Sequence, residues 1–464
     1  MDDTLFTTDD GRRRLAEELL PAWISSRRWF GGKARSPRKW NISRWEFVKP
    51  GWLVALDVEY EDRSTETYAV PLRLVSAEST FEPGALVARD AGTVLIDATH
   101  DPDFRAALFG LMVKNARSTL SGKSSSRLEA MFAGGEIPPS RVLDAEQSNT
   151  SLIYGEKLFV KFYRRLVAGV NPDGEITRVM GEQTTFRNGA AFCGAIEWDG
   201  AALALGVENV THQSDGWRLA LHHFGETAKA GQPSDTWLAL AKKLGQRTGE
   251  MHRALAGLPH LPEFAPEPIE PSEIMVLLRR ITRSAALVSE EIRARIEQLP
   301  REIRPAAEEA IRRLASLDPP GVPRIRATKI RIHGDYHLGQ VLFTGDDFVI
   351  MDFEGEPARS LDERRAKHPA LRDVAGMLRS LHYAAHAAGG GIEAAESWAV
   401  RSQQAFLEAW KAAVAGSVIA CDPVSERELL RLFLIEKALY EVAYELNNRP
   451  GWLAIPLRGV LALL

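Results

Sequence analysis

The stretch RIHGDYHLGQVLFTGDDFVIMDFEGEP, residues 331–357, decides how the rest of the chain is interpreted. Two apolar runs, VLF and FVIM, flank the turn TGDD, and this pattern predicts a β-hairpin. Asp335 and Gln340 precede the first run, and Asp352 and Glu354 follow the second. Closing the hairpin brings the two ends together, and oxygen ligands clustered in this way suit Mg²⁺.

The order of these residues matches the protein-kinase pattern H-R-D-x-x-x-x-N followed by D-F-G. The segment HGD (333–335) stands for the first triad, Gln340 takes the place of the metal-binding Asn, and DFE (352–354) replaces the second triad. In phosphoryl transfer, metal ions neutralise the phosphates and an aspartate orients the attacking hydroxyl. We therefore predict Asp335 as the catalytic base of an ATP-dependent transfer. The predicted ligands of Mg²⁺ are Gln340, Asp352 and Glu354.

A kinase-like enzyme also needs a β-rich lobe that holds the nucleotide. The strand candidates RVLDAEQ, TSLIYG and KLFVKFY follow one another, and Lys161 lies on the third. A helix predicted at about 173–190 supplies Glu175 to pair with that lysine. The loop EQSNTS takes the place of the phosphate-covering loop, and VENVTH, residues 207–212, is the predicted hinge at adenine. The predicted nucleotide-binding residues are Lys161, Glu175, Ser148, Asn149, Thr150, Glu208 and Val210.

The remaining pattern predicts an α+β, bilobal, protein-kinase-like fold. RWEFV, WLVALDVEY and TYAVPLRLV predict strands after a helix at about 12–25, and residues 101–133 are expected to be helical. AALALGVENV and GWRLALHHF predict two further strands, and helices dominate from residue 234, with Ser234 as an N-cap. The predicted domains are a β-rich N-terminal cap (1–90), an intermediate nucleotide-binding lobe (91–211) and a helical C-lobe (212–464).

Composition excludes several classes of protein. The net charge of −4 gives no bulk attraction to nucleic acid or to a membrane surface. Cys193 and Cys421 are too few for a disulfide framework or a zinc cluster and fit a reducing compartment. The start MDDTLFTTDDGRRRL lacks the apolar region of a secretory signal, and no apolar run approaches the ~20 residues of a membrane span. We expect a cytoplasmic enzyme without nucleic-acid or membrane partners.

Longer segments resemble the bacterial maltokinases, relatives of the aminoglycoside phosphotransferases. They are RRWFGGKAR, VLDAEQSNTS, GVNPDGE, HGDYHLGQVL, DFEGEPARSLDERRAKHPALRDVAGMLRS and EKALYEVAYELNNRPGWLAIPLRGV. The resemblance implies transfer of the ATP γ-phosphate to the anomeric hydroxyl of maltose, which gives maltose 1-phosphate for α-glucan synthesis. It also implies a link to trehalose synthase as a partner.

The resemblance also implies a sugar site in the C-lobe. Lys437, Tyr440 and Tyr444 are spaced so that they share one face of a helix, and Trp452 lies beyond it. The resemblance places these four residues at the sugar. His333 is expected both to brace its loop and to contact the sugar.

Alternatives remain open from the residues alone. HGDYH also reads as H-x-D-x-H, a transition-metal pattern, although the downstream acids favour Mg²⁺. Lys161 fits an exposed surface lysine, and Glu175 fits a first-turn acid favoured by the helix dipole. The acceptor could be another sugar or an amino sugar such as glucosamine. A non-catalytic kinase-like module is disfavoured because Lys161, Asp335, Gln340 and Asp352 are all present.

Overall fold

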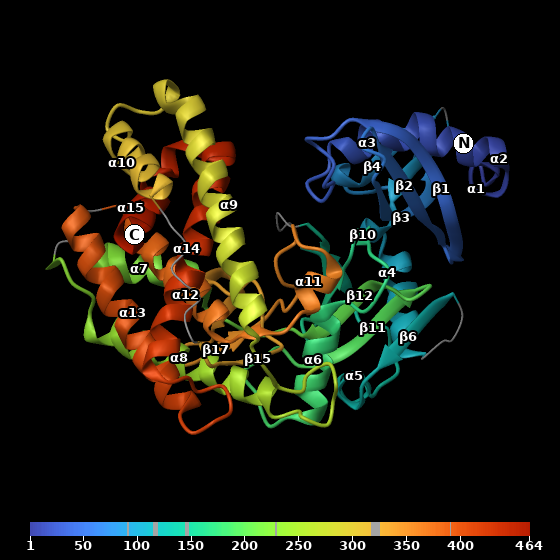
Figure 1. Cartoon of the computed structure of the whole chain (residues 1–464). Coiled ribbons are helices and arrows are strands. Elements are labelled where there is room, and N and C mark those ends of the chain that lie inside the picture. The colour runs from blue at the N-terminus through green and yellow to red at the C-terminus, as the bar shows by residue number, and fades with distance from the viewer. Residues whose placement is uncertain (91, 115–118, 144–147, 228–229, 317–324, 390) are drawn as a thin grey trace. The chain divides into compact units, whose positions relative to one another are not determined.

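Two units make up the chain in the computed structural model (Figure 1). Unit 1 comprises Met1–Arg178 and Ala190–Val210, and unit 2 comprises Val179–Gly189 and Thr211–Leu464. The division at residue 210 lies inside the predicted hinge segment, and the three predicted domains stay a prediction. The structure describes all residues except 91, 115–118, 144–147, 228–229, 317–324 and 390.

The N-terminal sheet of unit 1 is antiparallel, in the order β1-β2-β3-β5-β4, with β10 paired to β3. The three predicted strands are confirmed, and the sheet continues past residue 90 because β5 pairs with β3. The expected helix at 12–25 is interrupted by a π-helical turn at Leu15–Leu19. The elements are α1 (Thr4–Thr7), α2 (Asp9–Arg14), α3 (Leu20–Ser25), β1 (Pro37–Val48), β2 (Gly51–Tyr60), β3 (Thr65–Ser76), β4 (Leu86–Arg89), β5 (Thr93–Asp97) and β10 (Arg165–Leu166).

A second sheet in unit 1 has the order β6-β11-β12-β9-β8-β7. The expectation that residues 101–133 are helical is wrong in its middle, where β6 pairs with β11. Leu120 and Gly122 are buried and their neighbours are not, which is the two-residue period of a strand. The elements are α4 (Pro102–Val113), β6 (Leu120–Ser124), α5 (Ser126–Met131), β7 (Ser140–Val142), β8 (Thr150–Tyr154), β9 (Leu158–Phe162), β11 (Phe192–Trp198) and β12 (Ala201–Glu208). The helix α6 (Pro172–Gln183) begins in unit 1 and ends in unit 2.

The segment GWRLALHHF is helical, so its prediction as a strand is wrong. It forms α7 (Gly216–Thr227), in which Gly216, Leu219, Ala220 and Phe224 are buried. Spacings of three and four residues put these side chains on one helical face, which the strand interpretation overlooked. The strand β11 completes the second sheet instead.

Unit 2 is mainly helical, as expected. The predicted N-cap is confirmed, because Ser234 Oγ accepts a hydrogen bond of 3.2 Å from the backbone N–H of Trp237. Trp237 stacks on Trp398 with ring centroids 5.0 Å apart, which joins two long helices in the core. The helices are α8 (Asp235–Ala256), α9 (Pro271–Arg295), α10 (Arg304–Ala315), α11 (Leu361–Arg365), α12 (Leu371–Ala387), α13 (Ile392–Val414), α14 (Pro423–Asn448) and α15 (Ala454–Leu463).

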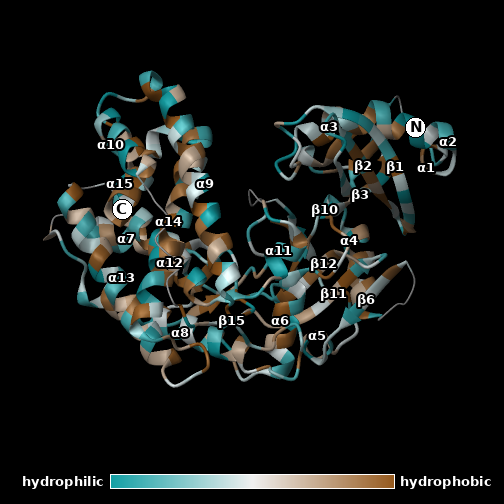
Figure 2. Cartoon of the chain, in the orientation of Figure 1, coloured by the Kyte–Doolittle hydropathy of each residue, from teal (hydrophilic) through white to brown (hydrophobic). Residues whose placement is uncertain are grey.

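Amphipathic helices build this unit. Teal and brown residues alternate along α9 in Figure 2, as expected for a helix with one buried face. The C-terminal helix α15 buries Leu457 and Val460 and packs against α14, so the last segment of the sequence docks on the core of this unit. None of the helices in the described part of the chain has the length and apolarity that a bilayer span requires.

The predicted hairpin is confirmed. Its strands pair Val341 with Ile350, and its turn is fixed by Arg247 of α8, whose guanidinium donates to both carboxylate oxygens of Asp347 at 2.9 and 2.6 Å. These contacts join the hairpin to the helical core and hold the flanking polar residues in place. The strands of this unit are β13 (Ser214–Asp215), β14 (Glu267–Pro268), β15 (Thr328–Ile330), β16 (Val341–Phe343), β17 (Phe348–Ile350) and β18 (His368–Pro369). With its antiparallel sheets and helical C-terminal part, the chain confirms the predicted α+β class.

Candidate active site

The segment His333–Asp335, called here the catalytic turn, is held by one buried carboxylate. Asp373 accepts hydrogen bonds from the backbone N–H of His333 at 2.8 Å and of Gly334 at 2.9 Å. Gly334 has φ +86°, a conformation that a side chain would strain. Residues far apart in sequence therefore fix the backbone from which the Asp335 side chain extends.

A chain of hydrogen bonds continues behind Asp373. The indole N–H of Trp410 donates to Nδ1 of His252 at 3.0 Å, so the His252 proton lies on Nε2, which is 3.1 Å from Oδ2 of Asp373. Burial alone would raise the pKa of Asp373, but the hydrogen bond from Nε2–H of His252 and the backbone N–H donors hold it below its usual value. Asp373 therefore stays an anionic acceptor for the turn.

The sequence analysis did not single out Asp373. It lies in the quoted segment PALRDVAG, at the start of α12, where the neighbouring Leu371 and Val374 are also buried. An aspartate within such an apolar stretch was the available signal, because a carboxylate is buried only when it has partners.

His333 has a structural place, and its predicted contact with the sugar is withdrawn. Its side chain is buried, Nε2–H donates to the carbonyl of Met351 at 2.9 Å, and Nδ1 accepts from the N–H of Asp335 at 3.4 Å. Both ring nitrogens are thus bonded to backbone, and no polar atom remains for a sugar. The same bonds speak against the transition-metal interpretation of HGDYH, since Nδ1 of His337 also accepts from a backbone N–H, that of Gly339 at 3.0 Å.

Lys437 of α14 stands beside the predicted base. Its Nζ lies 3.6 Å from Oδ1 of Asp335 and 3.1 Å from Oε1 of Glu356. Burial would lower the pKa of Lys437, but the two carboxylates raise it above its usual value. Burial would raise the pKa of Glu356, yet Lys437 and Arg359 lower it to about 2. A charged lysine thus contacts the carboxylate of Asp335.

The predicted metal ligands follow the hairpin. Asp352 has φ +67°, a left-handed conformation that is costly for a residue with a side chain and is found at functional sites. Carboxylate oxygens of Asp352 and Glu354 lie within 4.8 Å of one another, and Glu354 also accepts from Arg364 at 3.3 Å. The carbonyl of Gln340 accepts from the N–H of Met351, next to Asp352. The two carboxylates are oxygen donors of the kind that Mg²⁺ prefers, and ligation by the amide of Gln340 stays a prediction.

The predicted nucleotide-side residues lie in unit 1, where Lys161 forms an ion pair with Asp173. Its Nζ lies 3.2 Å from Oδ2 of Asp173, which also accepts from the hydroxyl of Tyr163 at 3.2 Å. Asp173 lies two residues before Glu175 in the first turn of α6. Asp173 was not among the residues predicted from the sequence, and the pairing of Lys161 with Glu175 stays a prediction. The signal was the Asx turn, in which the side chain of Asn171 accepts from the N–H of Asp173 at 2.8 Å.

The predicted phosphate loop is described from residue 148 onward, and the preceding residues of EQSNTS lie outside the described part of the chain. Ser148 is exposed, and the amide of Asn149 donates to its hydroxyl at 3.3 Å. Thr150 is buried, and its hydroxyl accepts from Arg164 at 2.7 Å. The Thr150 hydroxyl belongs to an interior network with Asp97, and the contact of Thr150 with a nucleotide stays a prediction.

The predicted hinge residues lie at the end of unit 1. Glu208 ends β12, and its carboxylate pairs with Arg127 at 2.7 Å. Its backbone N–H donates to the carbonyl of Ala191. Val210 is the last residue of unit 1. Their contact with a nucleotide stays a prediction.

The four predicted sugar residues line one pocket of about 500 Å³ in unit 2. Tyr440 and Tyr444 stack with centroids 6.3 Å apart, and the guanidinium of Arg449 lies 5.0 Å from the ring of Trp452. We call Lys437, Tyr440, Tyr444 and Trp452 the acceptor face. The other residues that line the pocket include His337, Ser380, Tyr383, Glu441, Glu445 and Arg449.

Two carboxylates of this pocket were missed from the sequence. Glu441 pairs with Arg379 at 2.6 Å, and Glu445 pairs with Arg449 at 2.7 Å. They follow Lys437 at intervals of four residues, so one face of α14 carries all three. The helical spacing that pointed to Lys437, Tyr440 and Tyr444 places Glu441 and Glu445 on the same part of α14.

The mixed fold, the braced catalytic turn and the hairpin acids define the class as a kinase-like phosphotransferase, and the sequence comparisons agree. Residues 203–355 match the phosphotransferase enzyme family, and residues 23–101 match the maltokinase N-terminal cap domain. Residues 23–101 are thus similar to the maltokinase cap, and residues 203–355 are similar to the phosphotransferases.

Similar proteins cover most of the chain. A glucosamine kinase from Streptacidiphilus jiangxiensis is 25% identical over 370 residues, which cover 75% of this chain and 78% of that protein. A glucosamine kinase from Mycolicibacterium smegmatis is 27% identical over 405 residues, covering 83% and 94%. A solved glucosamine kinase in complex with glucosamine, ADP and inorganic phosphate has a TM-score of 0.64 at 20% identity and covers 96% of this chain and 97% of that chain. This structural likeness shows a shared fold.

Proposed function

We propose that this protein transfers the γ-phosphate of ATP to a hydroxyl of a small sugar. One observation carries the proposal: Lys437 contacts the carboxylate of Asp335 and also lines the acceptor pocket. The predicted base therefore adjoins a pocket large enough for a sugar, and aromatic side chains on its wall suit the apolar face of a sugar ring.

In the proposed reaction, Asp335 accepts the proton of the sugar hydroxyl and orients its oxygen. That oxygen forms a bond to the γ-phosphorus, while the bond from the γ-phosphorus to the bridging oxygen breaks and ADP leaves with the electron pair. Asp352, Gln340 and Glu354 would hold Mg²⁺, which neutralises phosphate charge when bound. Lys161, paired with Asp173, would bind the phosphates of the nucleotide.

An amino sugar such as glucosamine is the acceptor that we favour. The relatives named as glucosamine kinases support this choice. Maltose, the acceptor predicted from the sequence, remains the second candidate because the cap matches the maltokinase cap model. A role in α-glucan synthesis and a link with trehalose synthase stay predictions.

A phosphorylation screen tests the function. The purified protein is incubated with ATP and Mg²⁺ over glucosamine, maltose, glucose and trehalose, and ADP release and the phosphorylated position are measured by a coupled assay and NMR. We expect turnover with glucosamine that the Asp335→Asn variant lacks. Turnover with maltose alone would restore the first prediction. Absence of turnover with any sugar would overturn the proposed function.

A further inference from the structure

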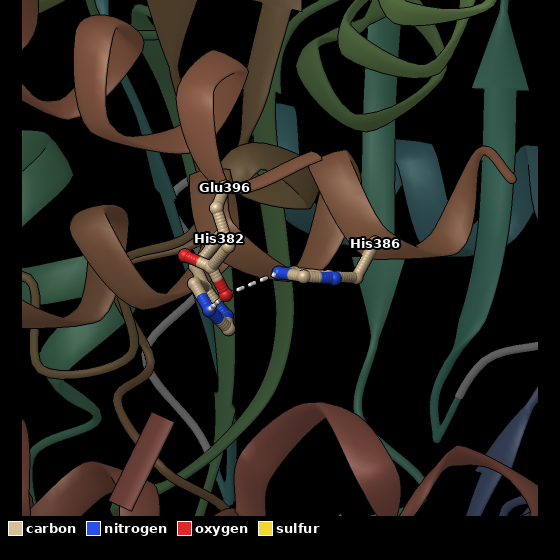
Figure 3. A group of neighbouring side chains, drawn as sticks. All are labelled: His382, His386 and Glu396. Carbon is tan, nitrogen blue, oxygen red and sulfur yellow. Dashed lines mark hydrogen bonds and ion pairs between the residues drawn. The ribbon is translucent and has the colours of Figure 1, made fainter. Parts of the chain in front are cut away.

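A cluster of two imidazoles and a carboxylate lies in unit 2, on residues that take no part in the proposed reaction. His382 and His386 stand one turn apart on α12, and Glu396 lies on α13. In Figure 3 the ring of His386 points at the carboxylate of Glu396, and His382 lies beside the same carboxylate. Helices α12 and α13 pack against each other, so the cluster joins two elements of the core.

The spacing of the polar atoms suits a small transition-metal ion. Oε1 of Glu396 lies 3.1 Å from Nε2 of His386 and 3.6 Å from Nε2 of His382, and one ligand atom from each residue lies within 4.8 Å of the others. Tetrahedral Zn²⁺ with bonds of ~2.0–2.1 Å separates neighbouring ligand atoms by about 3.3 Å. The two measured distances bracket that value, so small side-chain movements suffice to admit an ion.

The ligand types of His382, His386 and Glu396 also suit a transition-metal ion. Histidines four residues apart on a helix, with one carboxylate, form a familiar three-ligand zinc set that leaves a fourth position for water. The imidazole side chains are 8% and 6% exposed, and burial lowers the pKa of His382 to about 4 and also lowers the pKa of His386. Neutral imidazoles are the form that binds metals.

Hydrogen bonds between α12 and α13 account for only part of the arrangement of these three side chains. Among the described residues, the buried Nδ1 of His382 has no hydrogen-bond partner. The distances to Glu396 run from Nε2, so an ion would bind that nitrogen and leave the proton of Nδ1 for a water. Glu396 has a side chain that is 43% exposed, which gives an ion a path from solvent.

We propose that His382, His386 and Glu396 form a binding site for a divalent transition-metal ion of the zinc class, separate from the site for Mg²⁺. Its metal links α12 to α13 and stabilises the folded state. The soft imidazole ligands select Zn²⁺ or Co²⁺ over Mg²⁺, which prefers an all-oxygen shell. Excess Mg²⁺ therefore does not displace the ion.

Calorimetry with ZnCl₂ tests the proposal. Untagged, chelator-treated full-length protein is titrated in excess Mg²⁺, and we expect one saturable Zn²⁺ per chain. Loss of one ligand in His386→Ala or Glu396→Gln should weaken that binding by ~100-fold or more. His222→Ala is the control outside the cluster, because His222 lies on α7 and pairs with Glu226 at the surface at 3.6 Å; its Zn²⁺ binding should equal that of the wild type.

Two further measurements keep the test decisive. Co²⁺ in place of Zn²⁺ should give the strong visible absorption of a tetrahedral ion, and Zn²⁺ should raise Tm in the wild type but not in Glu396→Gln. Glu396→Gln keeps the size and partial exposure of the side chain, so it decides the outcome if His386→Ala fails to fold. Absence of saturable binding, or equal binding in wild type and Glu396→Gln, would overturn the proposal.

Discussion

The catalytic turn and the acceptor face lie in the same unit but are built in opposite ways. His333 and Asp373 are 1% and 2% exposed and are tied to backbone, whereas Tyr440 and Tyr444 are 48% and 43% exposed. A buried hydrogen-bond network permits one geometry, because each unsatisfied group is costly. Exposed side chains change at little cost to folding. Under the proposed function, the interior fixes the reacting groups, while the residues that contact the sugar are free to vary.

The largest effect is expected at Asp352. Asp352→Asn removes the charge and keeps a residue that tolerates left-handed φ. Weaker binding of the Mg²⁺ that offsets the phosphate charge should lower kcat on the order of 10³–10⁵-fold, measured over a Mg²⁺ titration. Gln340→Ala, which removes a neutral ligand, should be milder. Wild-type activity of Asp352→Asn at saturating Mg²⁺ would remove this residue from the site.

Asp335→Asn should follow. It keeps the shape of the side chain but cannot accept the hydroxyl proton, so kcat should fall by ~10²–10⁴-fold, the usual contribution of general-base catalysis. Nucleotide affinity, measured by calorimetry, should change little. A variant with wild-type kcat would show that Asp335 is not the catalytic base.

Asp373→Asn tests the interior network directly. The amide replaces one acceptor oxygen with a donor that faces other donors, so the free energy of unfolding should fall on the order of 3 kcal/mol, measured by urea denaturation. Asp362→Ala, at an exposed position on α11, is the control and should stay within ~0.5 kcal/mol of the wild type. Equal stability of the two variants would contradict the view that the buried network around Asp373 holds the catalytic turn in one geometry.

Lys437→Ala tests the acceptor face. It removes a charged hydrogen-bond donor from the pocket, so the KM for the sugar should rise about 10–100-fold while the KM for ATP changes little. Lys411→Ala, a half-exposed lysine on α13, should leave both constants unchanged. A changed KM for ATP with an unchanged KM for the sugar would place Lys437 on the wrong side of the site.

The smallest effect is expected at Tyr444. Tyr444→Ala should raise the KM for the sugar by about 2–10-fold, since an aromatic contact contributes on the order of 0.5–1.5 kcal/mol. Tyr444→Phe keeps the ring and should resemble the wild type. A clear loss of stability in Tyr444→Ala would contradict the view that exposed acceptor residues are free to change.

Local pattern was sufficient for the hairpin, the N-terminal strands and the N-cap at Ser234, because turn residues, alternation and capping act over a few residues. It failed for GWRLALHHF, whose short apolar run fits a strand and a helix equally, and the choice depends on which neighbours bury its face. The strand β6 was missed for the same reason, since its partner β11 lies about 70 residues away in sequence.

The candidate site shows the same limit. Asp335, Asp352 and Lys161 were recognised by spacing, which the sequence displays. Asp373 and Asp173 were missed because their roles depend on partners brought close by folding. Whether a histidine such as His333 faces a ligand or the interior likewise depends on tertiary packing, which a single sequence does not reveal.

The carboxylate of Asp373 has a consequence for the exchange of backbone hydrogens. Amides in loops outside helices and strands usually exchange quickly with solvent, because small local openings expose them. The N–H groups of His333 and Gly334 point instead at a buried anion. Their protons can reach water only when α12 separates from the turn, so these two loop amides should exchange as slowly as those of the core helices.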